Sequence, residues 1–68
     1  MTTNYKLVAQ RGKRSQTITF EEDDDGGAMM HSIFVILEKA KNNLLWSRGR
    51  IELINVDTNT LVRDMPAK

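Results

Sequence analysis

The chain has 68 residues, a formal net charge of +1 and no cysteine, and 40% of its residues are hydrophobic. A chain of this length forms one domain and buries only about 60% of the surface that its unfolded form exposes. The lack of cysteine excludes a disulfide scaffold and leaves His31 as the one soft zinc ligand. No apolar run approaches the roughly 20 residues that span a bilayer, and the polar N-terminus lacks the features of a signal peptide, so we expect a cytoplasmic protein.

The first part of the chain is typical of a β-hairpin. Apolar and polar side chains alternate over residues 5–10 and again over residues 15–21, as they do in half-buried strands. The alternation is interrupted from Arg11 to Ser15 around Gly12, where the chain is expected to turn. The tip of this hairpin therefore carries a basic cluster of Arg11, Lys13 and Arg14.

A helix is predicted over about residues 27–45. Between Gly27 and Leu45 there is no further glycine and no proline, and the apolar residues recur at helical spacing. One side carries Met30, Ile33, Phe34, Leu37, Leu44 and Leu45, and Met29, Ile36 and Ala40 widen this stripe. We expect the stripe to cover the sheet, with Phe34 joining Phe20 in the core. Asp24 or Asp25 is expected to cap the helix N-terminus.

Two further strands are predicted over residues 50–56 and 61–65, joined by a polar link from Asp57 to Thr60. The side chains of Asp57 and Asn59 are expected to bond nearby backbone amides in this link. The whole chain, residues 1–68, is thus predicted to be one small α+β domain: a two-layer ββαββ fold, with one antiparallel four-stranded sheet and a single helix packed on one face. The uncovered face is expected to carry Lys6, Val8, Thr17, Thr19, Arg50, Glu52, Ile54, Val62 and Asp64, and its apolar members indicate a contact.

An unbroken acidic run follows the hairpin and consists of Glu21, Glu22, Asp23, Asp24 and Asp25. Concentrated charge of this kind steers partners, so we interpret the run as a recognition patch for a basic partner. Its start resembles a calcium loop, but the glutamate required at the twelfth position falls on Phe34. We therefore predict neither a metal site nor a cofactor.

No catalytic residues are predicted. His31 is the one side chain whose ordinary pKa lies near neutrality, and the sequence offers no serine and aspartate pair placed to act with it. Gly26 and Gly27 precede a helix as in a phosphate-binding loop, but the neighbouring carboxylates would repel phosphate. The protein is accordingly not expected to be an enzyme.

Trp46 lies at the end of the predicted helix, followed closely by Arg48 and Arg50. Two interpretations stay open. In one, Trp46 is a lid over the end of the core. In the other, Trp46, Arg48 and Arg50 anchor a partner, because tryptophan and arginine are enriched among the residues that dominate binding energy.

The leading functional prediction is a small non-enzymatic protein-interaction module that binds and modulates a larger host or cellular protein, of a size and simplicity that suit a phage-encoded regulator. The acidic run, the hairpin tip and the Trp46 region would make the contact. The alternative is a nucleic-acid-binding module in which Arg11, Lys13, Arg14, Arg48 and Arg50 contact phosphates. A third prediction, compatible with either, is a homodimer formed through a sheet edge or through surplus apolar surface of the helix.

Overall fold

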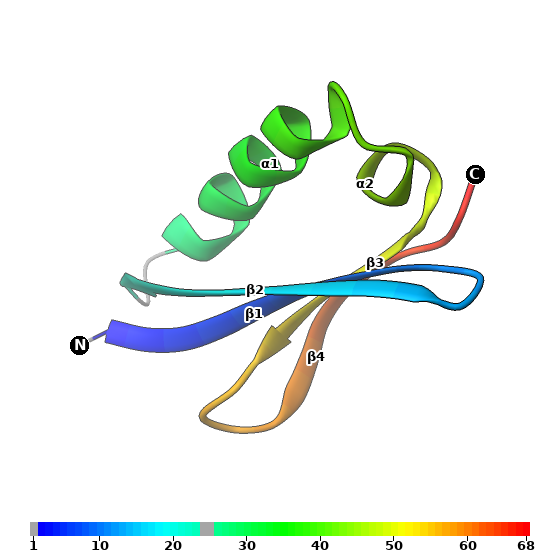
Figure 1. Cartoon of the computed structure of the whole chain (residues 1–68). Coiled ribbons are helices and arrows are strands. Elements are labelled where there is room, and N and C mark those ends of the chain that lie inside the picture. Colours follow the sequence, from blue (N-terminus) through cyan, green and yellow to red (C-terminus); the bar gives the residue numbers. More distant parts are fainter. Residues whose placement is uncertain (1, 24–25) are drawn as a thin grey trace.

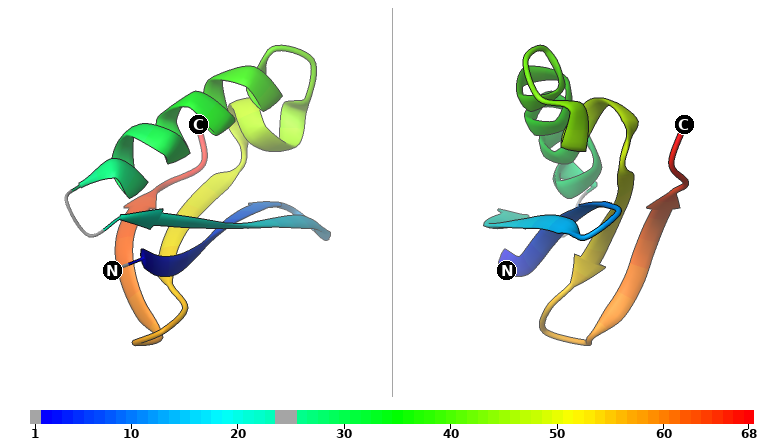
Figure 2. Two further views of the ribbon diagram at one scale, coloured as in Figure 1. Left: turned by 90° about the vertical axis from the view of Figure 1, so that its left-hand side faces the viewer. Right: turned by 45° about the vertical axis from the view of Figure 1, so that its right-hand side comes forward.

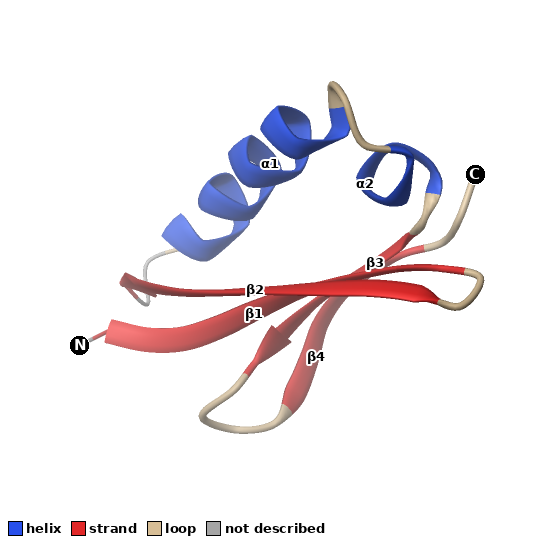
Figure 3. Cartoon of the chain, in the orientation of Figure 1, coloured by secondary structure: helices blue, strands red, loops and turns tan. Residues whose placement is uncertain are grey.

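The computed structural model describes residues 2–23 and 26–68, which form a sheet with two helices on one side of it (Figure 1). In chain order the elements are β1 (Thr2–Arg11), β2 (Arg14–Asp23), α1 (Gly27–Ala40), α2 (Leu44–Arg48), β3 (Arg50–Asn55) and β4 (Thr60–Met65). The four strands form one sheet in the order β2-β1-β3-β4, and every neighbouring pair is antiparallel. The predicted two-layer α+β fold is confirmed, with the short helix α2 as an addition (Figure 3).

The β1–β2 hairpin is longer and its turn is tighter than the sequence suggested. Arg11 pairs directly with Arg14, so only Gly12 and Lys13 form the connection. Gly12 has a positive φ of 62° and Lys13 does not, which is the combination found in a type II′ turn. This turn matches the twist of paired strands, which lets the ladder continue from the tip to Thr2 and Asp23.

The core lies between the centre of the sheet and α2. Leu7, Ala9, Ile51 and Leu53 are buried on the inner face of β1 and β3, and Trp46 of α2 covers them with only 1% of its surface exposed. The Trp46 indole Nε1 donates a 2.6 Å hydrogen bond to Gln16 Oε1 on β2, which satisfies the single polar atom of that side chain.

The predicted long helix is in fact two helices, because the chain turns after Ala40. Asn43 caps the second helix, and its Oδ1 accepts a 3.0 Å hydrogen bond from the backbone N–H of Leu45. The turn directs Trp46 down onto the sheet, and α2 fills the space between the far end of α1 and the strands (Figures 1 and 2).

The predicted orientation of the helix stripe is wrong. α1 faces the sheet with Ala28 and Ser32, which are buried, whereas Phe34 is 65% exposed and lies outside the core. The physical reason is that Trp46 already covers the middle of the inner sheet face, so α1 packs beside it and needs only small or half-buried side chains on that side. Of the remaining stripe residues, Met30, Ile33, Leu37 and Leu44 are also exposed, whereas Met29, Ile36, Ala40 and Leu45 are half-buried.

The start of α1 also differs from the prediction. The N-cap residue is Gly26, which has a φ of 96° and makes no side-chain capping bond. A φ in this range is open to glycine and strained for other residues. Asp24 and Asp25, the predicted caps, lie outside the described residues. Neither helix of the described chain is both long and apolar enough to cross a membrane.

The β3–β4 turn is tied to the start of β1 by Asp57. Its Oδ2 accepts a 3.0 Å bond from the backbone N–H of Asn4, and its Oδ1 accepts a 3.2 Å bond from the Asn4 side-chain amide. The prediction that Asp57 bonds within its own turn is therefore wrong: Asn55 has that role, since its Oδ1 accepts from the Thr58 N–H, and Asn59 adopts a φ of 53°. The two bonds from Asn4 lower the pKa of Asp57, with the backbone bond as the larger cause.

Replacing Asp57 with asparagine is expected to reduce stability at neutral pH but not in acid. A carboxyl group whose pKa is lowered by folding stabilises the protein above its unfolded value of about 3.9, and this stabilisation is lost as the pH falls through the folded value. Urea midpoints of the wild type and Asp57→Asn should therefore differ at pH 7 and converge below about pH 4. For Thr58→Ala, a neighbouring change without a titrating group, the difference from wild type should stay constant with pH. A constant difference for Asp57→Asn would contradict the assigned bonds.

Candidate protein-interaction site

The outer side of α1 carries an apolar ridge, defined by Met30, Ile33, Phe34 and Leu37. These residues follow the i, i+3, i+4, i+7 spacing of one helix face, and at about 100° per residue they lie opposite the buried Ala28 and Ser32. Met30, Ile33, Phe34 and Leu37 are 56%, 38%, 65% and 59% exposed, respectively. A helix normally turns such a face toward a core, so the ridge is a surface without a partner in the described chain.

The ridge is large for so small a protein. At about 200 Å² for each fully exposed large side chain, the four ridge residues present on the order of 400 Å² of apolar surface. That is about a tenth of the total accessible surface of 4867 Å². Contiguous apolar patches of this size on a monomer commonly mark sites of interaction.

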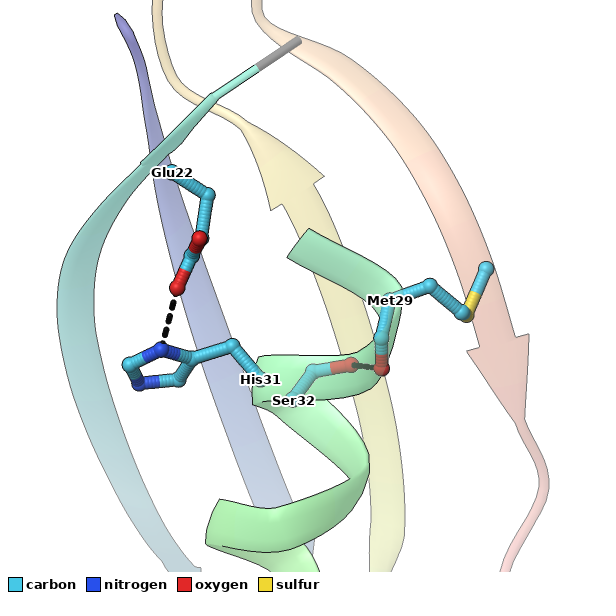
Figure 4. A network of polar contacts seen from close by, with 4 residues as sticks. All are labelled: Glu22, Met29, His31 and Ser32. Atoms are coloured by element: carbon cyan, nitrogen blue, oxygen red, sulfur yellow. Dashed lines mark hydrogen bonds and ion pairs between the residues drawn. The ribbon is translucent and has the colours of Figure 1, made fainter. Parts of the chain in front are cut away.

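The N-terminal end of α1 is fixed to β2 by His31. Its imidazole stacks on the Phe20 ring, with centroids 4.5 Å apart and an interplanar angle of 2°, and Phe20 stacks in turn on Tyr5. From β2, the Glu22 carboxylate points toward the His31 ring and contacts its Nδ1 (Figure 4). His31 thus positions the helix that carries the ridge, and its half-buried ring does not lie among the ridge residues.

Two further bonds steady this end of the helix. Ser32 Oγ donates a 2.8 Å bond to the carbonyl oxygen of Met29, which pairs the hydroxyl of the buried serine (Figure 4). The Met29 side chain extends away from His31, and its Sδ accepts a 3.3 Å contact from Arg63 Nη1 on β4. The first turns of α1 are therefore attached to both edge strands of the sheet.

Opposite charges flank the two ends of the ridge. At its N-terminal end, Glu21 and Asp23 are exposed on the last residues of β2, and Glu22 is turned toward His31. At its C-terminal end, Lys41 is exposed and lines a shallow hollow together with Phe34, Leu37 and Glu38. Asp24 and Asp25, the rest of the predicted acidic patch, lie outside the described residues.

The basic hairpin tip lies at the same end of the molecule as the C-terminal end of α1. Arg11 and Arg14 occupy directly opposed positions, a like-charge pairing that costs a hairpin some stability. Both line a hollow of about 290 Å³ with residues 42–45 of the turn and α2. Because β2 has ten residues, the tip lies about 30 Å from the acidic end of the strand, close to the 34 Å length of the whole molecule.

Trp46, Arg48 and Arg50 do not form the single patch that the sequence suggested. Trp46 is buried, so of its two interpretations the lid over the core agrees with the structure, and the partner anchor does not. Arg50 pairs with Asp64 through bonds of 3.0 and 2.9 Å, and this hydrogen-bonded carboxylate raises the pKa of the guanidinium. Arg48 is exposed at the end of α2.

Sequence reasoning identified every residue of the ridge but assigned it to the core. The signal that would have separated the two cases is the pair of small residues Ala28 and Ser32 on the other side of the helix, which allow a close approach to the sheet. Within residues 2–23 and 26–68, no three carboxylate or histidine side chains gather in a group suited to a metal ion. Comparison of the chain with profiles of known protein families, with curated proteins and with solved structures found no match.

Proposed function

We propose that this protein is a small non-enzymatic interaction module that binds a larger cellular protein and modulates it, with the apolar ridge of α1 as its main contact. The observation that supports the proposal is the exposure of Phe34 and Leu37, at 65% and 59%, on a helical face that also carries the exposed Met30 and Ile33. An exposed aromatic residue surrounded by aliphatic ones is the composition found at the energetic centre of protein interfaces.

The charged ends of the molecule would orient that contact. Glu21 and Asp23 lie at one end of the ridge, and Lys41 lies at the other, so a partner with the reverse polarity is favoured in one direction only. Charges at the rim of an interface act mainly on the association rate and on specificity, and their influence falls with salt. The ridge would then supply the affinity, and the ends would supply the orientation.

Site-specific cross-linking tests this proposal. A photoreactive phenylalanine analogue at position 34 should form an adduct with one larger protein in the cell in which this protein acts. The same analogue at Thr17, which is exposed on β2, is the matched control and should not form that adduct. Capture of no larger protein from position 34, or equal capture from both positions, would contradict the proposal.

A second candidate function, binding of nucleic acid, is favoured by one observation. Arg11 and Arg14 are held opposite one another beside Lys13, although their mutual repulsion opposes folding of the hairpin. A phosphate between the two guanidinium groups would remove that repulsion. Retardation of DNA or RNA at low salt that is lost in Arg11→Ser would support this function, and no retardation of either polymer would exclude it.

A further inference from the structure

We infer that a second copy of this chain covers the ridge when no larger partner is bound, in an antiparallel pair of α1 helices related by a two-fold axis. This inference rests on the proposed function in that both use the ridge. Beyond that function, it identifies a second copy of the chain as one molecule that binds the ridge and specifies how the two copies are arranged.

The residue pattern of the ridge suits pairing with itself. A two-fold axis between Ile33 and Phe34 places Met30 of one copy beside Leu37 of the other, and it brings the two Phe34 rings together at the centre. Every apolar residue of the ridge then meets an apolar residue. With the flanking side chains of Glu38 and Lys41, the contact comes to the lower end of the range for stable interfaces, about 600 Å² per partner.

The charges select the antiparallel direction. α1 starts near the end of β2, which carries Glu21 and Asp23, and runs toward the end of the molecule that holds the basic hairpin tip (Figure 1). Lys41 directly follows the last residue of α1. A parallel pair would bring acidic ends together and basic ends together. The antiparallel pair sets Lys41 of each copy toward Asp23 of the other, and it also opposes the two helix dipoles.

Sedimentation equilibrium of the full chain over a range of concentrations tests the inference. The wild type is expected to approach twice its chain mass of 7.8 kDa as concentration rises. Phe34→Glu should weaken the dimer by about a hundredfold or more, because each substitution enters the interface twice. Leu37→Glu is a second ridge variant with the same expectation, and circular dichroism checks that both variants stay folded, as their exposed positions allow.

The matched control tests whether the dimer instead forms by pairing of two sheet edges. In the β1–β2 ladder the backbone N–H of Thr17 points away from β1, so Thr17→Pro blocks pairing of two β2 edges without removing a hydrogen bond of the hairpin. The dimer should persist in Thr17→Pro. Loss of the dimer in Thr17→Pro together with its retention in Phe34→Glu would overturn the inference in favour of edge pairing.

A charge exchange tests the direction of the pair. Lys41→Glu and Asp23→Lys should each weaken the dimer several-fold, and the double variant should recover most of the wild-type affinity. No recovery would overturn the antiparallel arrangement. A wild type that stays monomeric at every concentration would overturn the dimer itself, whereas the proposed function would still be decided by the cross-link from position 34 to a larger protein.

Discussion

Trp46→Ala is expected to remove about half or more of the stability of the protein. The indole is the largest fully buried side chain and contacts a core that otherwise consists of Leu7, Ala9, Ile51 and Leu53. Truncating a buried tryptophan costs about 3 to 5 kcal/mol, and a 68-residue domain has only about 3 to 10 kcal/mol of stability in total. α2 has five residues and is too short to persist without this contact.

Trp46→Phe is the matched control for this change. It keeps most of the buried volume and removes the hydrogen bond from Nε1 to Gln16, so we expect a loss of about 1 to 2 kcal/mol and a folded protein. Urea denaturation followed by far-ultraviolet circular dichroism measures both variants. A Trp46→Ala protein whose midpoint lies within experimental error of Trp46→Phe would show that the indole does not hold α2 on the sheet.

Gly49→Ala is expected to destabilise the protein by about 3 kcal/mol, toward the upper end of the cost of overpacking. A Cβ atom at this position would lie 2.3 Å from the carbonyl oxygen of Leu45 and 2.6 Å from that of Gln10. Both are backbone atoms, so relief requires the end of α2 to move away from β1. The φ of −77° is ordinary for any residue, which means that the requirement for glycine here is one of space.

Gly12→Ala is the natural comparison, because at the hairpin turn glycine is required for its backbone conformation and not for lack of space. Nothing lies within 4 Å of a Cβ at Gly12, but its φ of 62° is unfavourable for alanine by about 1 to 2 kcal/mol. Thermal and urea midpoints should therefore rank wild type first, Gly12→Ala second and Gly49→Ala last. Equal midpoints for the two variants would show that α2 and β1 are not in close contact at Gly49.

The fold could be predicted from the sequence because the sheet depends on local patterns. Alternation around Leu7, Ile18 and Leu53 specifies which side of each strand faces inward, and the observed pairing of Leu7 with both Ile18 and Leu53 agrees with it. The extra lengths of β1 and β2 were missed for two reasons. At the tip, Arg11 and Arg14 pair because only Gly12 and Lys13 form the turn. At the other end, residues 2–4 pair with residues 21–23, and these polar side chains show no alternation that predicts a strand.

The direction of α1 could not be predicted for a different reason. A periodic apolar stripe shows that one face of a helix needs cover, but it does not say what provides the cover. Either the α1 stripe or Trp46 could have covered the inner face of the sheet. Trp46 covers it, because the chain turns at Asn43 and forms α2. The candidate site was therefore missed through a tertiary effect, since Phe34 and Leu37 have the same spacing whether they face the sheet or a second molecule.

The attachment of α1 also has a kinetic consequence. The helix is fastened near its start by His31 and Met29, and beyond them it adds only half-buried side chains such as Val35 and Ile36 to the core. It can therefore open while the strands and Trp46 keep their packing. Its amide hydrogens then exchange with solvent ahead of those of β1 and β3. Any molecule that binds the ridge slows this local opening. Binding can therefore be followed as a slower exchange of the amide hydrogens of α1.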